Sequence, residues 1–158
     1  MRDVKFSPDG TLIATGGHDY VIRIWDSETG EEIRALKGHH ASVTEVQFFP
    51  DGRRLLSSGD DRTARVWDIT TGELLNTLEG HTGVIDGLAI TPDGKRVFTG
   101  SSDQTIRVWD LKTTRQLLTL DSPYGHVHAL DLSPDGQMLI SAARGAASLW
   151  DTSGASTR

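Results

Sequence analysis

Histidine, aspartate and hydroxyl side chains recur along this chain at fixed spacing, and hydrolytic sites are built from these residue types. Gly-His pairs stand at residues 38–39 and 80–81, and polar turns carry Asp19, Asp61 and Asp103, again 42 positions apart. A serine, a histidine and an aspartate held close together can form a catalytic triad. A set that recurs in every repeat is instead what a scaffold needs. We therefore interpret these groups as structural.

Each polar group keeps a constant distance from a Trp-Asp pair. The pairs are separated by 42, 42 and 41 residues and contain all four tryptophans, and each follows an alternating apolar run such as Ile22-Arg23-Ile24. Alternation with a period of two is typical of a strand that buries one face. The pattern predicts four strands whose tryptophans face the core: Trp25, Trp67, Trp109 and Trp150.

A second marker, Pro-Asp-Gly, begins at residues 8, 50, 92 and 134. Proline presets its φ, aspartate bonds to nearby backbone and glycine accepts a positive φ, so each triplet predicts a hairpin between two short strands. A further turn after the Trp strand, such as Thr71-Gly72, opens an amphipathic outer strand. Four short strands per unit predict an antiparallel all-β repeat array.

The composition narrows the classes of partner. The net charge is -6 and the pI is about 5.4, which argues against a general nucleic-acid or anionic-membrane surface. The absence of cysteine excludes disulfides and thiolate metal sites. The start of the chain has no apolar stretch long enough for a signal peptide. We expect a cytoplasmic protein with no cofactor, no nucleic-acid partner and no membrane partner.

These markers together resemble the WD-repeat β-propeller family over residues 1–151, because a Gly-His pair, a Ser or Thr, a turn Asp and the Trp of a Trp-Asp pair recur in register. The resemblance implies an all-β fold of WD-repeat β-propeller blades, with four four-stranded antiparallel units of which the first and last are incomplete. The expected blades are about 1–37, 38–79, 80–121 and 122–151, followed by a disordered tail at 152–158.

The resemblance also implies a structural tetrad in each complete blade, with a hydrogen-bonded chain from Trp to Ser or Thr, then to His and to Asp. Two tetrads look complete: His39, Ser57, Asp61 and Trp67, and then His81, Thr99, Asp103 and Trp109. Two are partial: Thr15, Asp19 and Trp25 in the first unit, and Ser141 and Trp150 in the fourth.

The ends of the chain depart from the repeat. The first unit begins too late to contain a Gly-His pair, and the fourth has Ser122-Pro123 at that position and Arg144-Gly145 at a one-residue deletion. Gly125-His126 lies three residues too late, so we treat it as coincidental. The chain after Asp151 lacks apolar residues for an outer strand, apart from one Ala. We expect a segment of a longer, bacterial-type propeller, which self-associates or associates with further blades.

In the propeller family, the turns between second and third strands and the starts of first strands share one docking face. This implies candidate partner-binding residues, for which a solvated loop surface is the alternative: His18, Thr44, Asp60, Asp86, Ser102, Tyr124 and His128. His126 and His128 could bracket a metal ion, but without a further ligand at suitable spacing we assign no metal site.

The leading functional hypothesis is a non-catalytic scaffold that presents blade loops to a protein or peptide partner, and this step rests on family analogy. The alternatives are an enzyme or small-ligand propeller that uses its central channel, and a purely structural segment of a larger regulatory protein, such as propeller arrays attached to kinases. We assign no catalytic residue.

Overall fold

The computed structural model describes residues 1–152 and the backbone of residues 156–157. The chain forms four antiparallel sheets of four strands each, which confirms the predicted fold class. The strands of the first two sheets are β1 (Asp3–Phe6), β2 (Leu12–Gly16), β3 (Val21–Asp26), β4 (Glu32–Lys37), β5 (Val43–Phe48), β6 (Arg54–Gly59), β7 (Ala64–Asp68) and β8 (Leu74–Leu78). Those of the last two are β9 (Ile85–Ile90), β10 (Arg96–Ser101), β11 (Thr105–Asp110), β12 (Arg115–Asp121), β13 (Ala129–Leu132), β14 (Met138–Ala143), β15 (Ala146–Asp151) and β16 (Ser156–Thr157).

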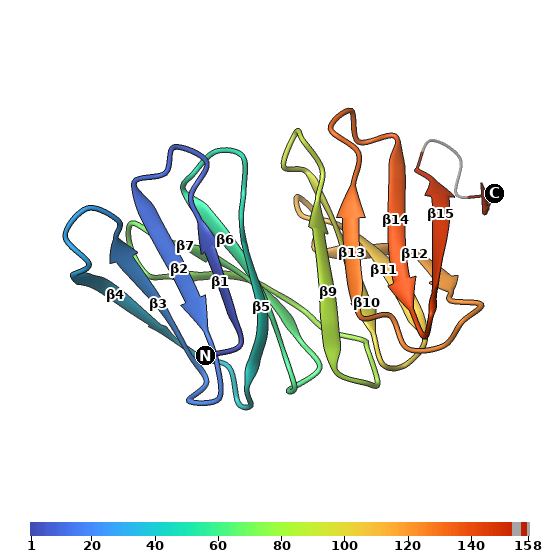
Figure 1. Ribbon diagram of the computed structural model, residues 1–158, viewed down its shortest axis with the longest axis horizontal. Coiled ribbons are helices and arrows are strands. Elements are labelled where there is room, and N and C mark those ends of the chain that lie inside the picture. The colour runs from blue at the N-terminus through green and yellow to red at the C-terminus, as the bar shows by residue number, and fades with distance from the viewer. Residues whose placement is uncertain (153–155, 158) are drawn as a thin grey trace.

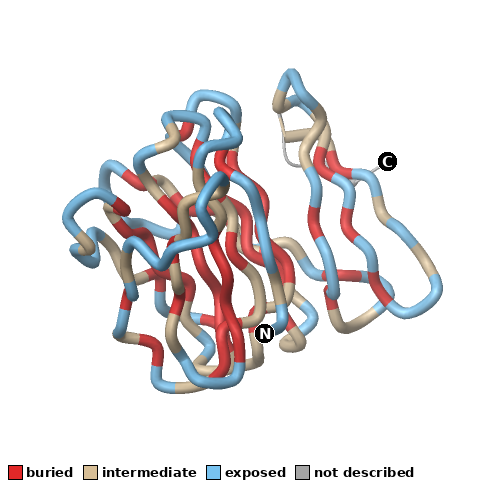
Figure 2. Tube along the Cα trace, turned by 60° about the vertical axis from the view of Figure 1, so that its left-hand side comes forward, coloured by how far each residue is buried: buried red, intermediate tan, exposed pale blue. Residues whose placement is uncertain are grey.

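The four sheets follow one another in chain order around a row of inner strands. Strand β1 contacts β5, β5 contacts β9, and β9 contacts β13. Figure 1 shows the first and fourth sheets at opposite ends of the row, and Figure 2 shows the fourth sheet standing apart from the first. The described sheets therefore form an open arc.

The hairpins form as predicted. The glycines of the Pro-Asp-Gly triplets all have positive φ, between 64° and 74°. Their aspartates accept backbone N–H bonds from the residue just before the second strand, and Asp51 accepts from both Arg53 and Arg54. Between the second and third strands, a non-glycine residue takes positive φ in three sheets, and Gly145 takes it in the fourth. The deletion in the fourth repeat is thus absorbed in this turn.

The core lies between sheets. Each junction packs the Trp strand of one sheet against the preceding sheet, as Trp67 packs with Ala14 and Ile24. Trp67, Trp109 and Trp150 are at most 4% exposed. The prediction for Trp25 was wrong: it is only partly buried and lines an open pocket, because none of the four described sheets packs against that face.

Both terminal units form four strands, although β16 has only two residues, paired with Trp150 and Asp151. The expectation that the last unit lacks an outer strand was wrong, because backbone pairing does not require apolar side chains. Of the tail predicted to be disordered at 152–158, residues 153–155 and 158 lie outside the described residues. The first sheet forms all four of its strands.

Candidate functional site

In the second sheet, the four predicted tetrad residues form one hydrogen-bonded chain. The Trp67 indole N–H donates to Ser57 Oγ over 2.8 Å. His39 Nε2 lies 2.8 Å from the same hydroxyl, and its Nδ1 lies 2.8 Å from Asp61 Oδ2. The histidine comes from the loop after β4, so the chain of bonds ties the first sheet to the second.

The third sheet repeats this arrangement. Trp109 donates to Thr99 Oγ1 over 2.9 Å, and His81 lies 2.7 Å from both Thr99 Oγ1 and Asp103 Oδ2. The Thr82 N–H also donates to Asp103. The same set therefore ties the second sheet to the third.

The two aspartates are held as carboxylates. Burial opposes ionisation of Asp103, but hydrogen bonds from Thr105, His81 and the Thr82 N–H outweigh burial and lower its pKa to about 2. The same balance holds the pKa of Asp61 well below its usual value. Burial lowers the pKa of His81, against the opposing effect of Asp103. Neutral histidine can donate to the carboxylate from Nδ1 and accept at Nε2.

The buried position of these groups argues against hydrolysis. The His39 and His81 side chains have no exposed surface. The Ser57 and Thr99 hydroxyls already accept an indole N–H, and both residues are fully buried. A nucleophile must reach a substrate carbonyl, and no substrate reaches these hydroxyls in the folded state. The geometry of these hydrogen-bonded chains suits a structural role, in which each chain joins two neighbouring sheets.

The terminal sheets keep part of the set. Trp25 donates to Thr15 Oγ1 over 2.9 Å, and Trp150 donates to Ser141 Oγ over 2.9 Å. Asp19 bonds to Arg23 instead of a histidine. The fourth sheet has no turn aspartate because of the deletion.

Most of the candidate docking residues contact a neighbouring sheet. Asp60 pairs with Arg2 at 2.9 Å, His18 Nδ1 lies 3.3 Å from Ser42 Oγ, and Thr44 donates to the Ile85 carbonyl. Asp86 Oδ2 lies 2.7 Å from His126 Nε2, and the His126 ring is tilted against the ring of the exposed His128, with 4.0 Å between their centroids. Sequence reasoning dismissed His126 because it lies outside the tetrad register, and only the fold brings it to Asp86.

A polar pocket lies on this rim where the third and fourth sheets meet. Two candidates, Ser102 and Tyr124, line it with Gln104, Gly125, His126 and Arg144. Arg144 occupies the turn from which the deletion removed the aspartate. The pocket thus combines an exposed tyrosine, an arginine and several hydrogen-bonding groups.

Carboxylates on the inner strands form a second repeating feature, which sequence reasoning missed. Asp3 accepts the Val46 N–H over 3.0 Å, and Glu45 accepts the Leu88 N–H over 2.9 Å, so each joins its strand to the next inner strand. The third position of this series is Gly87, where an added Cβ would lie 3.1 Å from Leu130 N. The sequence signal for this series is the spacing of 42 residues between Asp3, Glu45 and Gly87.

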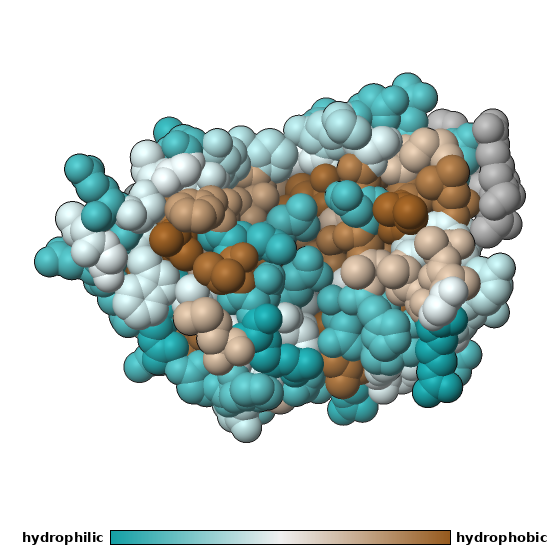
Figure 3. All heavy atoms as spheres, viewed as in Figure 1, coloured by the Kyte–Doolittle hydropathy of each residue, from teal (hydrophilic) through white to brown (hydrophobic). Residues whose placement is uncertain are grey.

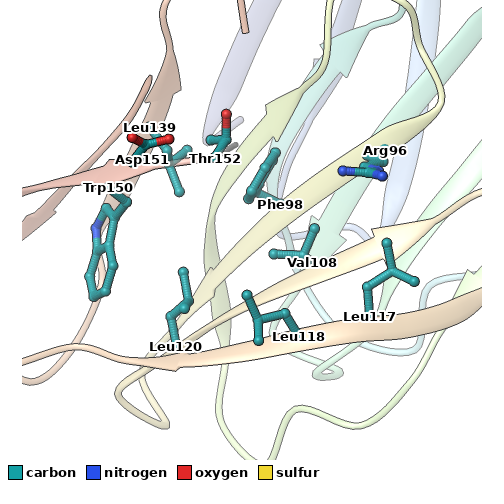
Figure 4. Close-up of a pocket in the computed structure, with 10 residues that line it drawn as sticks. All are labelled: Arg96, Phe98, Val108, Leu117, Leu118, Leu120, Leu139, Trp150, Asp151 and Thr152. Carbon is teal, nitrogen blue, oxygen red and sulfur yellow. The ribbon is translucent and has the colours of Figure 1, made fainter. Parts of the chain in front are cut away.

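An apolar pocket of about 260 Å³ lies between the third and fourth sheets. Figure 4 shows Phe98, Val108 and Leu118 on one side and Leu139 and Trp150 on the other. One of its lining residues, Thr152, lies two places after Trp150, and the side chain at this position differs between the junctions. Buried Ile69 and Leu111 hold that position at the inner junctions, whereas Thr152 holds it here. The side chain at this position is therefore smaller and polar at the third junction.

Within residues 1–152, no group of three or more His, Asp or Glu side chains is arranged to hold a metal ion. No helix long and apolar enough to cross a membrane occurs among the described residues.

The recurring four-stranded sheets and the Trp–hydroxyl–His–Asp chains define a repeat protein of the β-propeller class. Residues 1–26, 30–68, 72–110 and 115–151 match the family model described as WD domain, G-beta repeat. The chain therefore belongs to the WD-repeat family.

Curated relatives match the chain over about one repeat. The general transcriptional corepressor TUP1 of Saccharomyces cerevisiae is 46% identical over 43 residues, which are 27% of this chain and 6% of that protein. The nuclear distribution protein PAC1-1 of Uncinocarpus reesii is 51% identical over 41 residues, 26% of this chain and 9% of that protein. The probable serine/threonine-protein kinase PkwA of Thermomonospora curvata is 47% identical over 36 residues, 23% of this chain and 5% of that protein. The chain thus matches only a small part of each relative.

Proposed function

We propose that this protein is a non-catalytic interaction scaffold that docks a protein or peptide partner on the rim pocket formed by Ser102, Gln104, Tyr124, His126 and Arg144. The pocket carries the proposal because it places a half-exposed tyrosine beside an arginine. Tyrosine and arginine are over-represented among residues that dominate binding energy at protein interfaces.

The scaffold behind the rim favours docking of this kind. The tetrads join the first three sheets, and the bonds Asp60–Arg2 and Asp86–His126 join neighbouring sheets at the rim. A surface held in place before binding loses little conformational entropy on association. The rim is therefore a preorganised platform.

The chemistry of the pocket favours an extended segment that carries an acidic side chain. Arg144 offers a guanidinium, which pairs well with a carboxylate, and Ser102, Gln104 and Tyr124 offer further hydrogen bonds. Names of the relatives include a corepressor and a kinase, which fits a scaffold that belongs to larger regulatory proteins.

The test selects binding peptides from a random library on the immobilised chain and measures their affinity by titration. Tyr124→Ala and Arg144→Ala should each weaken the selected peptides at least tenfold. Leu75→Ala, which changes an exposed residue on the outer strand β8, is the matched control and should leave affinity unchanged. Peptides that lose affinity only in the control variant would refute the rim as the docking site.

A small apolar ligand is a second candidate, favoured by the pocket between the third and fourth sheets (Figure 4). Its lining is mostly aliphatic and aromatic, so the pocket suits burial of a hydrocarbon group. Binding there would be abolished by filling the pocket from Thr152 and would not respond to Tyr124→Ala.

A further inference from the structure

We propose that the junction between the third and fourth sheets binds an α-amino acid with a large apolar side chain, whose carboxylate pairs with Arg96 and whose ammonium group pairs with Asp135. This binding rests on the second candidate function, since the apolar pocket beside Trp150 must accept the side chain of the ligand. The charged head group is new, and it defines the class of ligand.

The apolar pocket has room for a ring or a branched chain. Its volume is about 260 Å³, and Phe98, Leu118 and Trp150 are among the residues that line it. Dry protein cavities of about 150 Å³ with a lining of this kind bind benzene. Figure 3 shows further apolar side chains over parts of the first and fourth sheets, spread across the surface. The pocket instead lies between two sheets, so it suits a single side chain.

A polar pocket shares one wall with the apolar one. It measures about 280 Å³ and is lined by Thr91, Pro92, Asp93, Arg96, Asp135 and Gly136. Arg96 lines both pockets. Figure 4 shows this arginine on the opposite side of the apolar pocket from Trp150. A ligand that extends from one pocket into the other therefore passes Arg96.

Arg96 has no bonded partner, whereas its counterpart at the preceding junction is fully engaged. Arg54, 42 positions earlier, donates from Nε to Asp51 over 2.7 Å and from Nη2 to the Gly94 carbonyl over 3.3 Å. Its guanidinium also lies 4.2 Å from the centre of the Phe49 ring. The Arg96 guanidinium forms no hydrogen bond or ion pair within residues 1–152. It is therefore available to a ligand.

Two differences between the repeats leave Arg96 without these contacts. Thr91 holds the position of Phe49 and offers no aromatic ring to the guanidinium. Asp93 holds the position of Asp51, but it accepts from the Thr91 hydroxyl over 2.6 Å and lies 3.6 Å from Lys95 Nζ. The polar pocket is thus the counterpart of the place where arginine and phenylalanine pack at the preceding junction.

Asp135 supplies the opposite charge in the same pocket. The Ser133 hydroxyl and the Gln137 N–H donate to Asp135 Oδ1 over 2.6 and 3.0 Å. These bonds lower the pKa of Asp135, so it is a carboxylate at neutral pH. Among the described residues, no cation pairs with it, and no ion pair joins it to Arg96. A small zwitterion that lies between the two groups satisfies both.

A ligand with a carboxylate alone fits less well. Hydrogen bonds from Thr113 lower the pKa of Asp110, and the charge of Arg96 adds to this effect, so Asp110 lies within reach of the same guanidinium. Asp93 and Asp135 line the polar pocket as well. A fatty acid would meet these carboxylates without a cation of its own. An amino acid brings its ammonium group.

The test is a calorimetric titration of the full chain with L-phenylalanine and three analogues. 3-Phenylpropanoate lacks the ammonium group, 2-phenylethylamine lacks the carboxylate, and ethylbenzene lacks both. L-Phenylalanine should bind more tightly than each singly charged analogue by about fivefold, because each analogue forms one charge pair fewer.

Two variants assign the charges. Arg96→Gln should weaken binding of L-phenylalanine and 3-phenylpropanoate by about fivefold and should not weaken binding of 2-phenylethylamine. Asp135→Asn should weaken binding of L-phenylalanine and 2-phenylethylamine and should not weaken binding of 3-phenylpropanoate. Arg53→Gln, at an exposed arginine of the second sheet, is the control and should change none of these affinities. Arg96 is exposed and has no bonded partner, so its variant keeps the fold and tests the proposal even if Asp135→Asn loosens its turn.

The outcomes separate this proposal from the second candidate function. Equal affinity for ethylbenzene and L-phenylalanine would overturn the charged head group and leave the apolar pocket as a binding site. Absence of binding by all four compounds would overturn both. An equal response of 3-phenylpropanoate and 2-phenylethylamine to Arg96→Gln would refute the pairing of the carboxylate with this arginine.

Discussion

Trp25 and Trp67 make the same hydrogen bond from equivalent positions but differ in what covers them. Trp67 is 1% exposed under the first sheet and shares its Ser57 partner with His39. Trp25 is half-buried beside an open pocket. The contribution of this repeated residue to stability therefore depends on the neighbouring sheet.

Trp67→Ala should lower the free energy of unfolding by about 3–5 kcal/mol, because it removes a fully buried side chain and leaves Ser57 without its donor. Trp25→Ala should cost less than half as much. Chemical denaturation of the two variants and the wild type measures the difference. Equal losses of unfolding free energy in the two variants would show that burial under a neighbouring sheet does not determine how much each tryptophan contributes to stability.

Glu45 gives a pH dependence at the junction of β5 and β9. Burial, with the negative charge of Asp3, raises its pKa to about 7 from 4.5. The folded state thus binds more protons than the unfolded state between these values, and stability falls as pH rises across this window. Glu45→Gln keeps an acceptor for the Leu88 N–H and removes the charge.

At pH 8, Glu45→Gln should increase the free energy of unfolding by on the order of 2 kcal/mol, and near pH 4.5 it should have little effect. Thermal unfolding at both pH values measures this. Glu31→Gln, at an exposed carboxylate, is the control and should show no such difference. A Glu45→Gln effect of equal size at both pH values would contradict the assignment.

At the scale of elements, the three junctions between sheets are built alike but filled differently. The buried side chains of Ile69 and Leu111 fill the first two junctions. The backbone N–H of each donates to the carbonyl of the residue just after the Pro-Asp-Gly turn of its own sheet. The Thr152 N–H donates to the Gln137 carbonyl in the same way. The main chain of Thr152 therefore holds the same place in its repeat as those of Ile69 and Leu111. Thr152 therefore brings a smaller side chain to the pocket from the position that Ile69 and Leu111 fill at the other junctions.

Thr152→Leu should be more stable than Thr152→Ala by about 1–2 kcal/mol, because leucine fills apolar space that alanine leaves open. Both variants lose the bond from Thr152 Oγ1 to the Gly136 carbonyl, so their difference isolates the filling. Denaturant midpoints measure it. A leucine variant no more stable than the alanine variant would show that the pocket does not accept a side chain from this position.

At the scale of the whole molecule, the arc has two unlike apolar ends. The first sheet exposes Val4 and Phe6, and the fourth exposes Ile140 and Leu149. In the interior, residues at the same repeat positions pack against one another. The two ends are therefore complementary apolar surfaces. A head-to-tail contact between copies gives a closed ring only if the rotations from one chain to the next add up to a full turn.

In the absence of a further blade, the chain should associate head-to-tail at micromolar concentration, most simply as two copies. Light scattering should give a mass above 17.2 kDa. Phe6→Glu should shift the mass toward the monomer, whereas Ile33→Glu, at an exposed site on the edge strand β4, should not. A wild-type monomer with cooperative unfolding would exclude this association.

The repeat period by itself determined the number of sheets, the hairpins and the members of the hydrogen-bonded sets. Each marker, such as Pro50-Asp51-Gly52 or Trp67, depends on local backbone geometry or on strand alternation. Such a signal can be recognised within one repeat, and its recurrence at the same position in the next repeat supports the assignment.

Only the tertiary structure decided what lies across the junctions. The partial exposure of Trp25, the bond from His126 to Asp86, the Glu45 acceptor for Leu88 and the pocket beside Thr152 all depend on residues about 40 positions away or on a neighbouring sheet. The repeat period predicts which residues hold the same position in each sheet. Burial and pKa values depend on the surrounding side chains, which differ between repeats, and each end sheet of the arc packs against a described sheet on one side alone.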